Sequence, residues 1–135
     1  MLLGDADRIQ QVLLNLLSNA RKYVPKNNGR IMIESELQQH DESLILKISV
    51  TDNGPGISEL DQQKLFKPFS KLGAYADLNP NGLGLGLSIC KLICNCMGGD
   101  IVVESENGTK FTYWVAVKNP VEHDFYIQPT ERTGL

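Results

Sequence analysis

The chain has 135 residues and a mass of 15.0 kDa, which corresponds to one domain. Hydrophobic residues make up 41% and charged residues 21%, an ordinary globular composition that excludes a wholly disordered chain. Its 13 basic and 16 acidic residues give a net charge of −3, so it lacks the basic excess expected of a nucleic-acid-binding protein. The chain has neither a long apolar run nor a basic leader, so we expect that it does not contact a membrane and that it lies in the cytoplasm. This expectation also holds if the chain is part of a longer, membrane-anchored protein.

The first part of the chain predicts a helix followed by two strands. Asp5 is a helix cap and Pro25 ends the helical pattern. Between them, apolar residues recur at helical spacing: Ile9, Val12, Leu13, Leu16, Leu17, Ala20 and Val24. Alternating residues predict strands over 31–37 and 44–51, joined by a polar connection over 40–43, and we expect them to pair as a hairpin.

Beyond this hairpin, the sequence predicts a turn, two helices and two more strands. The turn is Asp52-Asn53-Gly54-Pro55-Gly56, after which Ser58 is a cap and a short helix is expected over 62–66. The remaining elements are an apolar helix over 83–97, ended by Gly98-Gly99, and strands over 101–105 and 109–117 around a turn at Asn107-Gly108.

Residues 70–81 show little periodicity and are expected to form a loop, and 119–135 a disordered tail or linker. This leaves a domain over residues 1–118. Helices mixed with antiparallel strands indicate an α+β two-layer sandwich, with helices on one face of a mixed, mostly antiparallel sheet.

Three cysteines, Cys90, Cys94 and Cys96, form an odd, clustered set that argues against a disulfide framework. Cys90 and Cys94 lie one helical turn apart, as metal ligands can, but no second pair exists and His40 and His123 are distant in sequence. Buried thiols in an apolar helix are the favoured interpretation.

Three segments carry residue types suited to binding a nucleotide. In the first helix, Asn15, Asn19 and Lys22 share one stripe beside Tyr23, where amide oxygens suit Mg²⁺ and the ammonium suits phosphate. Taken alone, this stripe is better explained as a solvated helix face. Asp52, at the end of a strand, can accept a hydrogen bond from an exocyclic amine such as that of adenine, although an ordinary Asx-type turn is the alternative.

The third segment, Gly82-Leu83-Gly84-Leu85-Gly86-Leu87, runs into a helix. Its glycines allow the backbone to approach a bulky anion, and amides at a helix N-terminus can hold phosphate. It matches neither the P-loop nor the dinucleotide-binding pattern, and a flexible hinge is the alternative.

The order and spacing of these segments resemble the ATP-binding catalytic domain of sensor histidine kinases, within the superfamily shared with gyrase, a mismatch-repair ATPase and a heat-shock chaperone. The resemblance covers about residues 4–117. It rests on five segments: Gly4–Tyr23 (asparagine box), Asp52–Ile57 (first glycine box), Leu65–Phe69 (phenylalanine box), Gly82–Leu87 (second glycine box) and Gly98–Ser105 (the following strand). It implies a Bergerat-type ATP-binding fold.

By this resemblance, Asn19 binds Mg²⁺ and Asn15 supports the metal and the phosphates. Lys22 contacts phosphate, as does Lys71, and these two residues together with Asn15 form the catalytic set. Asp52 accepts a hydrogen bond from the adenine amine, and residues 70–81 form a lid over ATP. Further nucleotide contacts are implied for Tyr23, Gly54, Gly56, Ile57, Phe69, Gly82, Leu83, Gly84, Leu85, Gly86 and Leu87.

The chain also departs from the family pattern. Leu83 stands where the family often has Thr or Ser, so one hydroxyl contact is lost. The phosphoacceptor helix is absent, because His40 lies between two strands and His123 lies in the tail. Only Met1–Leu3 precede the asparagine box, so we expect a trimmed domain or a fragment that lacks the family's first strand and helix. Because the family's dimerising helices are absent as well, we expect a monomer.

The position at which the superfamily's ATPases carry a water-activating Glu is Asn15 in this chain, and an amide is no general base. The resemblance therefore implies slow hydrolysis and transfer of the ATP γ-phosphoryl to a histidine on a separate dimerisation domain, which passes it to a response-regulator receiver. Two alternatives stay open: a non-catalytic nucleotide-binding or regulatory module of the same fold, and a serine kinase of the mitochondrial dehydrogenase-kinase branch.

Overall fold

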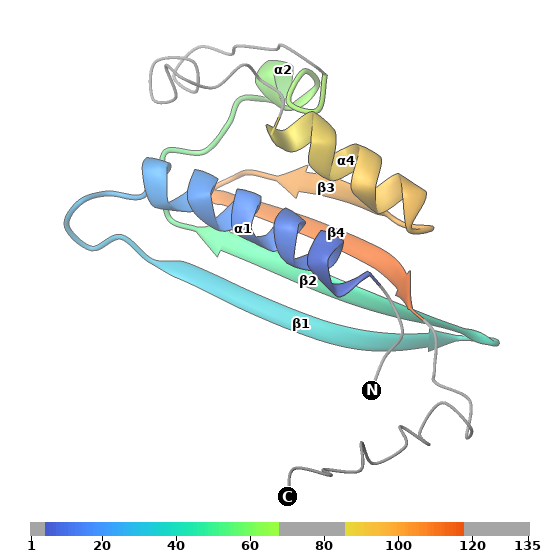
Figure 1. Ribbon diagram of the computed structural model, residues 1–135. Coiled ribbons are helices and arrows are strands. Elements are labelled where there is room, and N and C mark those ends of the chain that lie inside the picture. Colours follow the sequence, from blue (N-terminus) through green and yellow to red (C-terminus); the bar gives the residue numbers. More distant parts are fainter. Residues whose placement is uncertain (1–4, 68–85, 118–135) are drawn as a thin grey trace, which may run out of the picture.

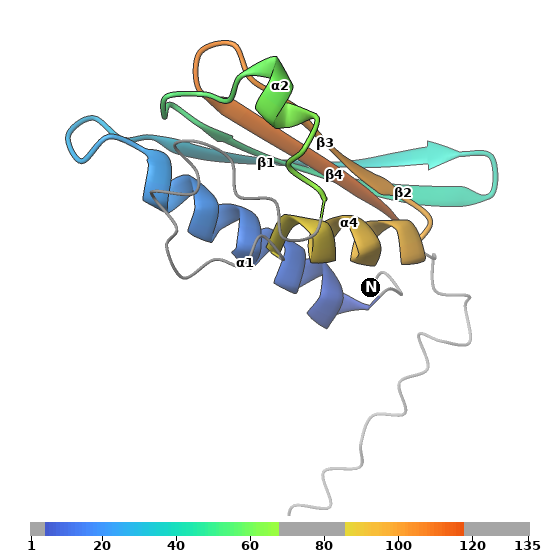
Figure 2. The ribbon, with the colours of Figure 1, turned by 90° about the horizontal axis from the view of Figure 1, so that it is seen from above.

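The computed structural model describes residues 5–67 and 86–117. Four strands form one antiparallel sheet in the order β1-β2-β4-β3. Their bounds are β1 Ile31–His40, β2 Ser43–Asp52, β3 Asp100–Glu104 and β4 Thr109–Val117. Two helices, α1 (Ala6–Tyr23) and α4 (Gly86–Cys96), lie side by side over one face, with the short α2 (Glu59–Gln62) at one end (Figures 1 and 2). The predicted α+β two-layer architecture is confirmed.

Helix α1 begins and ends where its sequence predicts. The side chain of Asp5 accepts a hydrogen bond of 3.1 Å from the Arg8 amide and so caps the first turn. Its buried residues recur at helical spacing and face the sheet: Val12, Leu16, Ala20 and Tyr23. Val24 adopts an extended conformation before Pro25, which cannot continue the helix.

The core lies between the two helices and the sheet. Alternate residues of β2 and β4 point into it, and Tyr113 at its centre is fully buried, with its hydroxyl donating to the Ile9 carbonyl of α1. Cys90 and Cys94 of α4 are also fully buried in this core. The interpretation of these two cysteines as buried thiols is confirmed.

Helix α4 ends at the predicted Gly98-Gly99 pair. Gly98 has a φ of +76°, and the Gly99 amide donates to the Cys94 carbonyl at 2.9 Å, an arrangement typical of a helix C-terminus closed by glycine. A β-carbon on Gly99 would lie 1.7 Å from the Trp114 carbonyl oxygen, so this glycine also lets the chain pass close to β4.

Three details differ from the sequence-based expectations. The short helix covers Glu59–Gln62 rather than 62–66, because Ser58 caps it directly by accepting from the Asp61 amide, and residues 63–66 form turns. The hairpin connection is Asp41-Glu42 alone, since Asp41 adopts a φ of +53° that closes a tight turn. The described strands pair antiparallel throughout, where a mixed but mostly antiparallel sheet was expected.

Strand β1 is more exposed than the other strands. Ile31, Ile33 and Leu37 pair with residues on the helix-covered face of β2, but each is between 39% and 49% exposed. β1 lies at an edge of the described sheet, beyond β2, and the helices cover mainly the other three strands (Figure 1). The loop expected over 70–81 and the tail expected over 119–135 lie outside the described residues.

Candidate nucleotide-binding site

Asp52 is the last residue of β2, and it is buried, with only 5% of its surface exposed. Burial raises the pKa of its carboxyl, and backbone hydrogen bonds from Gly54 and Thr109 oppose that rise. The Gly54 amide donates to Asp52 Oδ1 at 2.9 Å, so the Asx-type turn is present. Because a carboxylate offers about four acceptor positions, this turn leaves room for an amine of a ligand.

The loop that follows Asp52 is tied to the C-terminal end of α1. A β-carbon on Gly54 would lie 2.8 Å from the Tyr23 carbonyl oxygen, so glycine permits this close approach. Asn53 accepts from the Arg30 amide and donates to the Asn28 carbonyl, each at 2.7 Å. These contacts hold the Asp52 loop against the end of the helix that carries the asparagine stripe.

The polar stripe of α1 lies partly at the surface and partly against α4. Asn15 and Asn19 are half-buried, and Lys22 is exposed. Asn15 Nδ2 donates to the Cys90 thiol of α4 at 3.4 Å. Tyr23 is buried, and this burial raises the pKa of its phenol to about 12, so it is neutral at physiological pH.

Of three further residues predicted to contact nucleotide, two lie in the hydrophobic core and one starts a helix. The side chains of Ile57 and Leu87 belong to the hydrophobic core, so nucleotide contacts by these residues would go through their backbone. Gly86 starts α4, and a β-carbon there would meet nothing within 4 Å. The other predicted residues lie outside the described part of the chain: Phe69, Lys71, Gly82, Leu83, Gly84 and Leu85.

Sequence reasoning missed several residues that hold this region together: Asn53, Cys90, Ser105 and Thr109. Each acts through a contact with a segment far away in the sequence, for which the sequence contains no local signal. The exception is the turn that carries Ser105 and Thr109, which the Asn107-Gly108 pair does predict.

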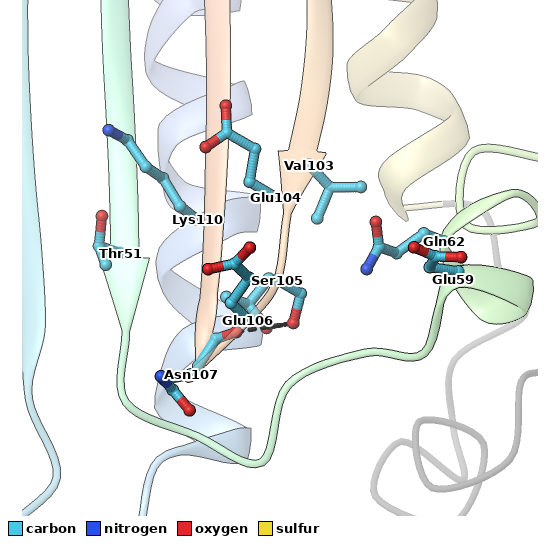
Figure 3. A pocket seen from close by; sticks show the side chains of 11 residues that line it. Thr51, Glu59, Gln62, Val103, Glu104, Ser105, Glu106, Asn107 and Lys110 are labelled. Carbon is cyan, nitrogen blue, oxygen red and sulfur yellow. Dashed lines mark hydrogen bonds between the residues drawn. The ribbon is translucent and has the colours of Figure 1, made fainter.

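A cavity of about 580 Å³ lies between α2 and the β3–β4 turn (Figure 3). Its walls include Glu59 and Gln62 of α2 and Glu104, Ser105 and Lys110 of the two strands and their turn. Among the residues that the structure describes, none of those predicted to bind nucleotide or metal lines it. It is therefore a different place from the nucleotide site described above.

Within the described residues, no three His, Cys, Asp or Glu side chains are grouped as metal ligands. No described helix is long and apolar enough to cross a membrane.

Comparison with known proteins identifies the family. Residues 4–119 match the family described as "Histidine kinase-, DNA gyrase B-, and HSP90-like ATPase". The chain is 38% identical over 125 residues to the sensor histidine kinase GacS of Pseudomonas protegens. This match covers 91% of the chain and 13% of GacS. It is 41% identical over 111 residues to the hybrid signal transduction histidine kinase B of Dictyostelium discoideum, covering 82% of the chain and 6% of that protein.

Solved structures agree with these sequence relatives. The catalytic domain of histidine kinase ThkA superimposes with a TM-score of 0.68 at 36% identity, covering 86% of this chain and 71% of that one. Full-length ShkA in complex with AMPPNP gives a TM-score of 0.69 at 27% identity, covering 89% of this chain and 24% of ShkA. The chain therefore belongs to the histidine kinase-, DNA gyrase B- and HSP90-like ATPase family, as an ATP-binding catalytic domain of the sensor histidine kinase type.

Proposed function

We propose that this domain binds Mg·ATP and donates the γ-phosphoryl group to a histidine on a separate dimerisation domain. In this transfer, the bond between the γ-phosphorus and the β–γ bridging oxygen breaks and a phosphorus–nitrogen bond forms. ADP leaves, and the imidazole loses its proton to solvent. The relatives named above are much longer than this chain, which supports placing the acceptor histidine elsewhere in the complete protein.

The buried Asp52 is the observation that carries this proposal. A buried carboxylate that ends a strand and faces a glycine loop is costly to keep, because burial disfavours its charge. An exocyclic amine of adenine offers a hydrogen bond to this group and would offset part of that cost. The ATP analogue AMPPNP bound to the similar ShkA supports the same ligand class.

The residues of α1 fit a magnesium ion that is shared with the phosphates. Mg²⁺ is held by few protein ligands and keeps contacts to water and phosphate oxygens, so a cage of carboxylates is not needed. Asn19 would hold the ion through its amide oxygen, and Asn15 would support it. The ion would supply charge neutralisation for the phosphates. Lys22 would add a second positive charge, and Lys71 is proposed for the same role.

The polar residues of α1 favour transfer to histidine over hydrolysis. No acidic residue occurs between Arg8 and Val24, and the amide of Asn15 cannot accept a proton from water. A neutral imidazole needs no such base, since it is a nucleophile at neutral pH. We expect the chain alone to hydrolyse ATP far below the typical enzyme rate of about 10 s⁻¹. A rate near that of efficient ATPases, abolished by Asn15→Ala, would contradict this expectation.

The experiment that tests this proposal adds a purified dimerisation domain and labelled ATP to the chain. Acid-labile phosphohistidine on the added domain is the expected product. A chain that binds ATP without transferring it would instead be a nucleotide-binding regulatory module, and an acid-stable product would indicate a serine kinase. Calorimetry of Mg·ATP with the wild type and Asp52→Asn tests binding separately from transfer.

We place this reaction in the cytoplasm and propose a response-regulator receiver as the next phosphoryl acceptor. All three cysteines are free thiols, which suits a reducing compartment, and ATP is the phosphoryl donor. The hybrid histidine kinase of Dictyostelium is a relative that supports a phosphorelay. Detection of phosphoaspartate on an added receiver domain, dependent on the dimerisation domain, tests this order of transfer.

A further inference from the structure

The loop that carries Asp52 is joined on its far side to the turn between β3 and β4. The Ile57 amide donates to Ser105 Oγ at 2.7 Å, and Ser105 Oγ donates to the Gly108 carbonyl at 2.6 Å. Both bonds are short, and the hydroxyl acts once as acceptor and once as donor. Figure 3 shows the Ser105 side chain at the end of β3, above the segment that leads from β2 to α2.

The backbones around this hydroxyl approach so closely that side chains are excluded. Gly56 has a φ of +80°, and a β-carbon there would lie 2.9 Å from Ser105 Oγ. Gly108 has a φ of +96°, and a β-carbon there would lie 2.1 Å from the Asp52 carbonyl oxygen. The turn that holds Ser105 is therefore in direct contact with Asp52, the residue proposed to accept a hydrogen bond from adenine.

One of the polar contacts of Asp52 comes from the residue that follows this turn. The backbone of Thr109, the residue paired with Asp52 in the sheet, forms a hydrogen bond to its carboxylate. Ser105 Oγ also lies 3.4 Å from Thr109 Oγ1. A shift of this turn would therefore displace Asp52 and the loop after it together.

We propose that Ser105 is a positioning residue of the adenine pocket, whose hydroxyl fastens the Asp52–Ile57 loop to the β3–β4 turn and so sets the affinity for the base. This inference rests on the proposed function, because it assumes that Asp52 contacts adenine. Ser105 itself does not touch the nucleotide. Its hydroxyl accepts from the Ile57 amide and donates to the Gly108 carbonyl, and it acts through the geometry of the loop.

The test compares Ser105→Ala and Ser105→Thr with the wild-type chain by calorimetry of ATP and GTP. Loss of the hydroxyl in Ser105→Ala should weaken ATP binding by about three- to tenfold, the equivalent of one ordinary hydrogen bond. Binding of GTP should change less, because guanine carries a carbonyl oxygen at C6 where adenine carries the amine that would donate to Asp52, so the preference for ATP falls. Ser105→Thr retains the hydroxyl and should restore most of the affinity.

Ser49→Ala is the matched control. It also removes a hydroxyl with a hydrogen bond of 3.0 Å, to Thr112, but on the sheet face opposite the core. This variant should bind ATP as the wild type does. Equal ATP affinity of Ser105→Ala and the wild type, or an equal loss in Ser49→Ala, would overturn the inference.

Amide hydrogen exchange tests the same contact without any nucleotide. The Ile57 amide should exchange faster in Ser105→Ala than in the wild type, while amides within β2 and β4 keep their protection. Retained protection of Ile57 in this variant would overturn the role of Ser105. A wild type that fails to bind ATP, but shows the exchange difference, would refute the proposed function and leave the fastening of the loop intact.

Discussion

The side-chain amide of Asn15 on α1 donates a hydrogen bond of 3.4 Å to the thiol of Cys90 on α4. Cys90 is fully buried at this contact, and burial raises the pKa of its thiol. With the amide nitrogen turned to the sulfur, the oxygen of Asn15 is turned away from it. This orientation suits the supporting role that we propose for Asn15 at the phosphates.

The environment of the three cysteines predicts their reactivity. Cys90 and Cys94 are fully buried, and burial raises the pKa of Cys94 to about 12, so both are protected neutral thiols. Cys96 is exposed. We expect a thiol reagent such as DTNB to modify one cysteine in the folded chain and all three in denaturant. In Cys96→Ser the folded chain should not react, and rapid reaction of this variant would show that α4 does not pack as described.

Asp52→Asn should separate stability from binding. Burial raises the pKa of Asp52, so the folded state holds the proton more tightly than the unfolded state does. The contribution of Asp52 to stability is then fully present below the ordinary aspartate pKa of about 3.9 and is lost as pH rises through the higher folded value. The amide variant lacks this loss, so it should unfold at neutral pH with equal or greater free energy than the wild type and with a flatter pH profile.

The same substitution removes the proposed acceptor for adenine. A hydrogen bond to a charged group contributes about 1.5–3 kcal/mol, so ATP binding should weaken roughly 10- to 150-fold. Urea unfolding between pH 3 and 8 and calorimetry of Mg·ATP are the two measurements. A variant that is less stable at neutral pH and binds ATP like the wild type would contradict both parts of this expectation.

Local sequence signals predicted the described elements well, because each signal acts over a few residues. Asp5 marks the start of α1 and Pro25 marks its end. Alternating residues identified β2, because one face of that strand packs on the helices. The short helix was expected to begin at residue 62, but it begins directly after its cap Ser58, and the segment that buries Leu65 forms turns.

The candidate site was predicted only in part, for a related reason. Asp52 and Gly54 stand in a recognisable turn, and resemblance to a family assigned them a role. The contact between Ile57 and Ser105 spans 48 residues, and the contact between Asn15 and Cys90 spans 75. Such contacts depend on the packing of α4 and the β3–β4 turn against distant elements, which no local pattern encodes.

Asn19→Ala should reveal the proposed magnesium site. Loss of residues that only support a metal ligand already costs about 10- to 100-fold in metal affinity, so loss of the ligand should weaken binding of Mg·ATP at least tenfold. Binding of ATP without magnesium should change little. Ser18→Ala, at the exposed neighbouring position, is the control and should behave as the wild type. Equal loss of ATP binding with and without magnesium would argue that Asn19 contacts the nucleotide directly.

Gly108→Ala should damage both the fold and the adenine pocket. The residue has a φ of +96°, and a β-carbon would lie 2.1 Å from the Asp52 carbonyl oxygen, a backbone atom that cannot move away alone. Strained backbone of this kind costs about 1–3 kcal/mol, and the clash adds to it, so the free energy of unfolding should fall by roughly 2–4 kcal/mol. ATP affinity should fall as well, because Asp52 is displaced.

Gly86→Ala is the stability control: a β-carbon there meets no atom within 4 Å, and alanine is favoured over glycine in a helix by up to about 1 kcal/mol. Urea unfolding of the two variants would contradict this account if Gly108→Ala were as stable as Gly86→Ala, since the β3–β4 turn would then not press on Asp52.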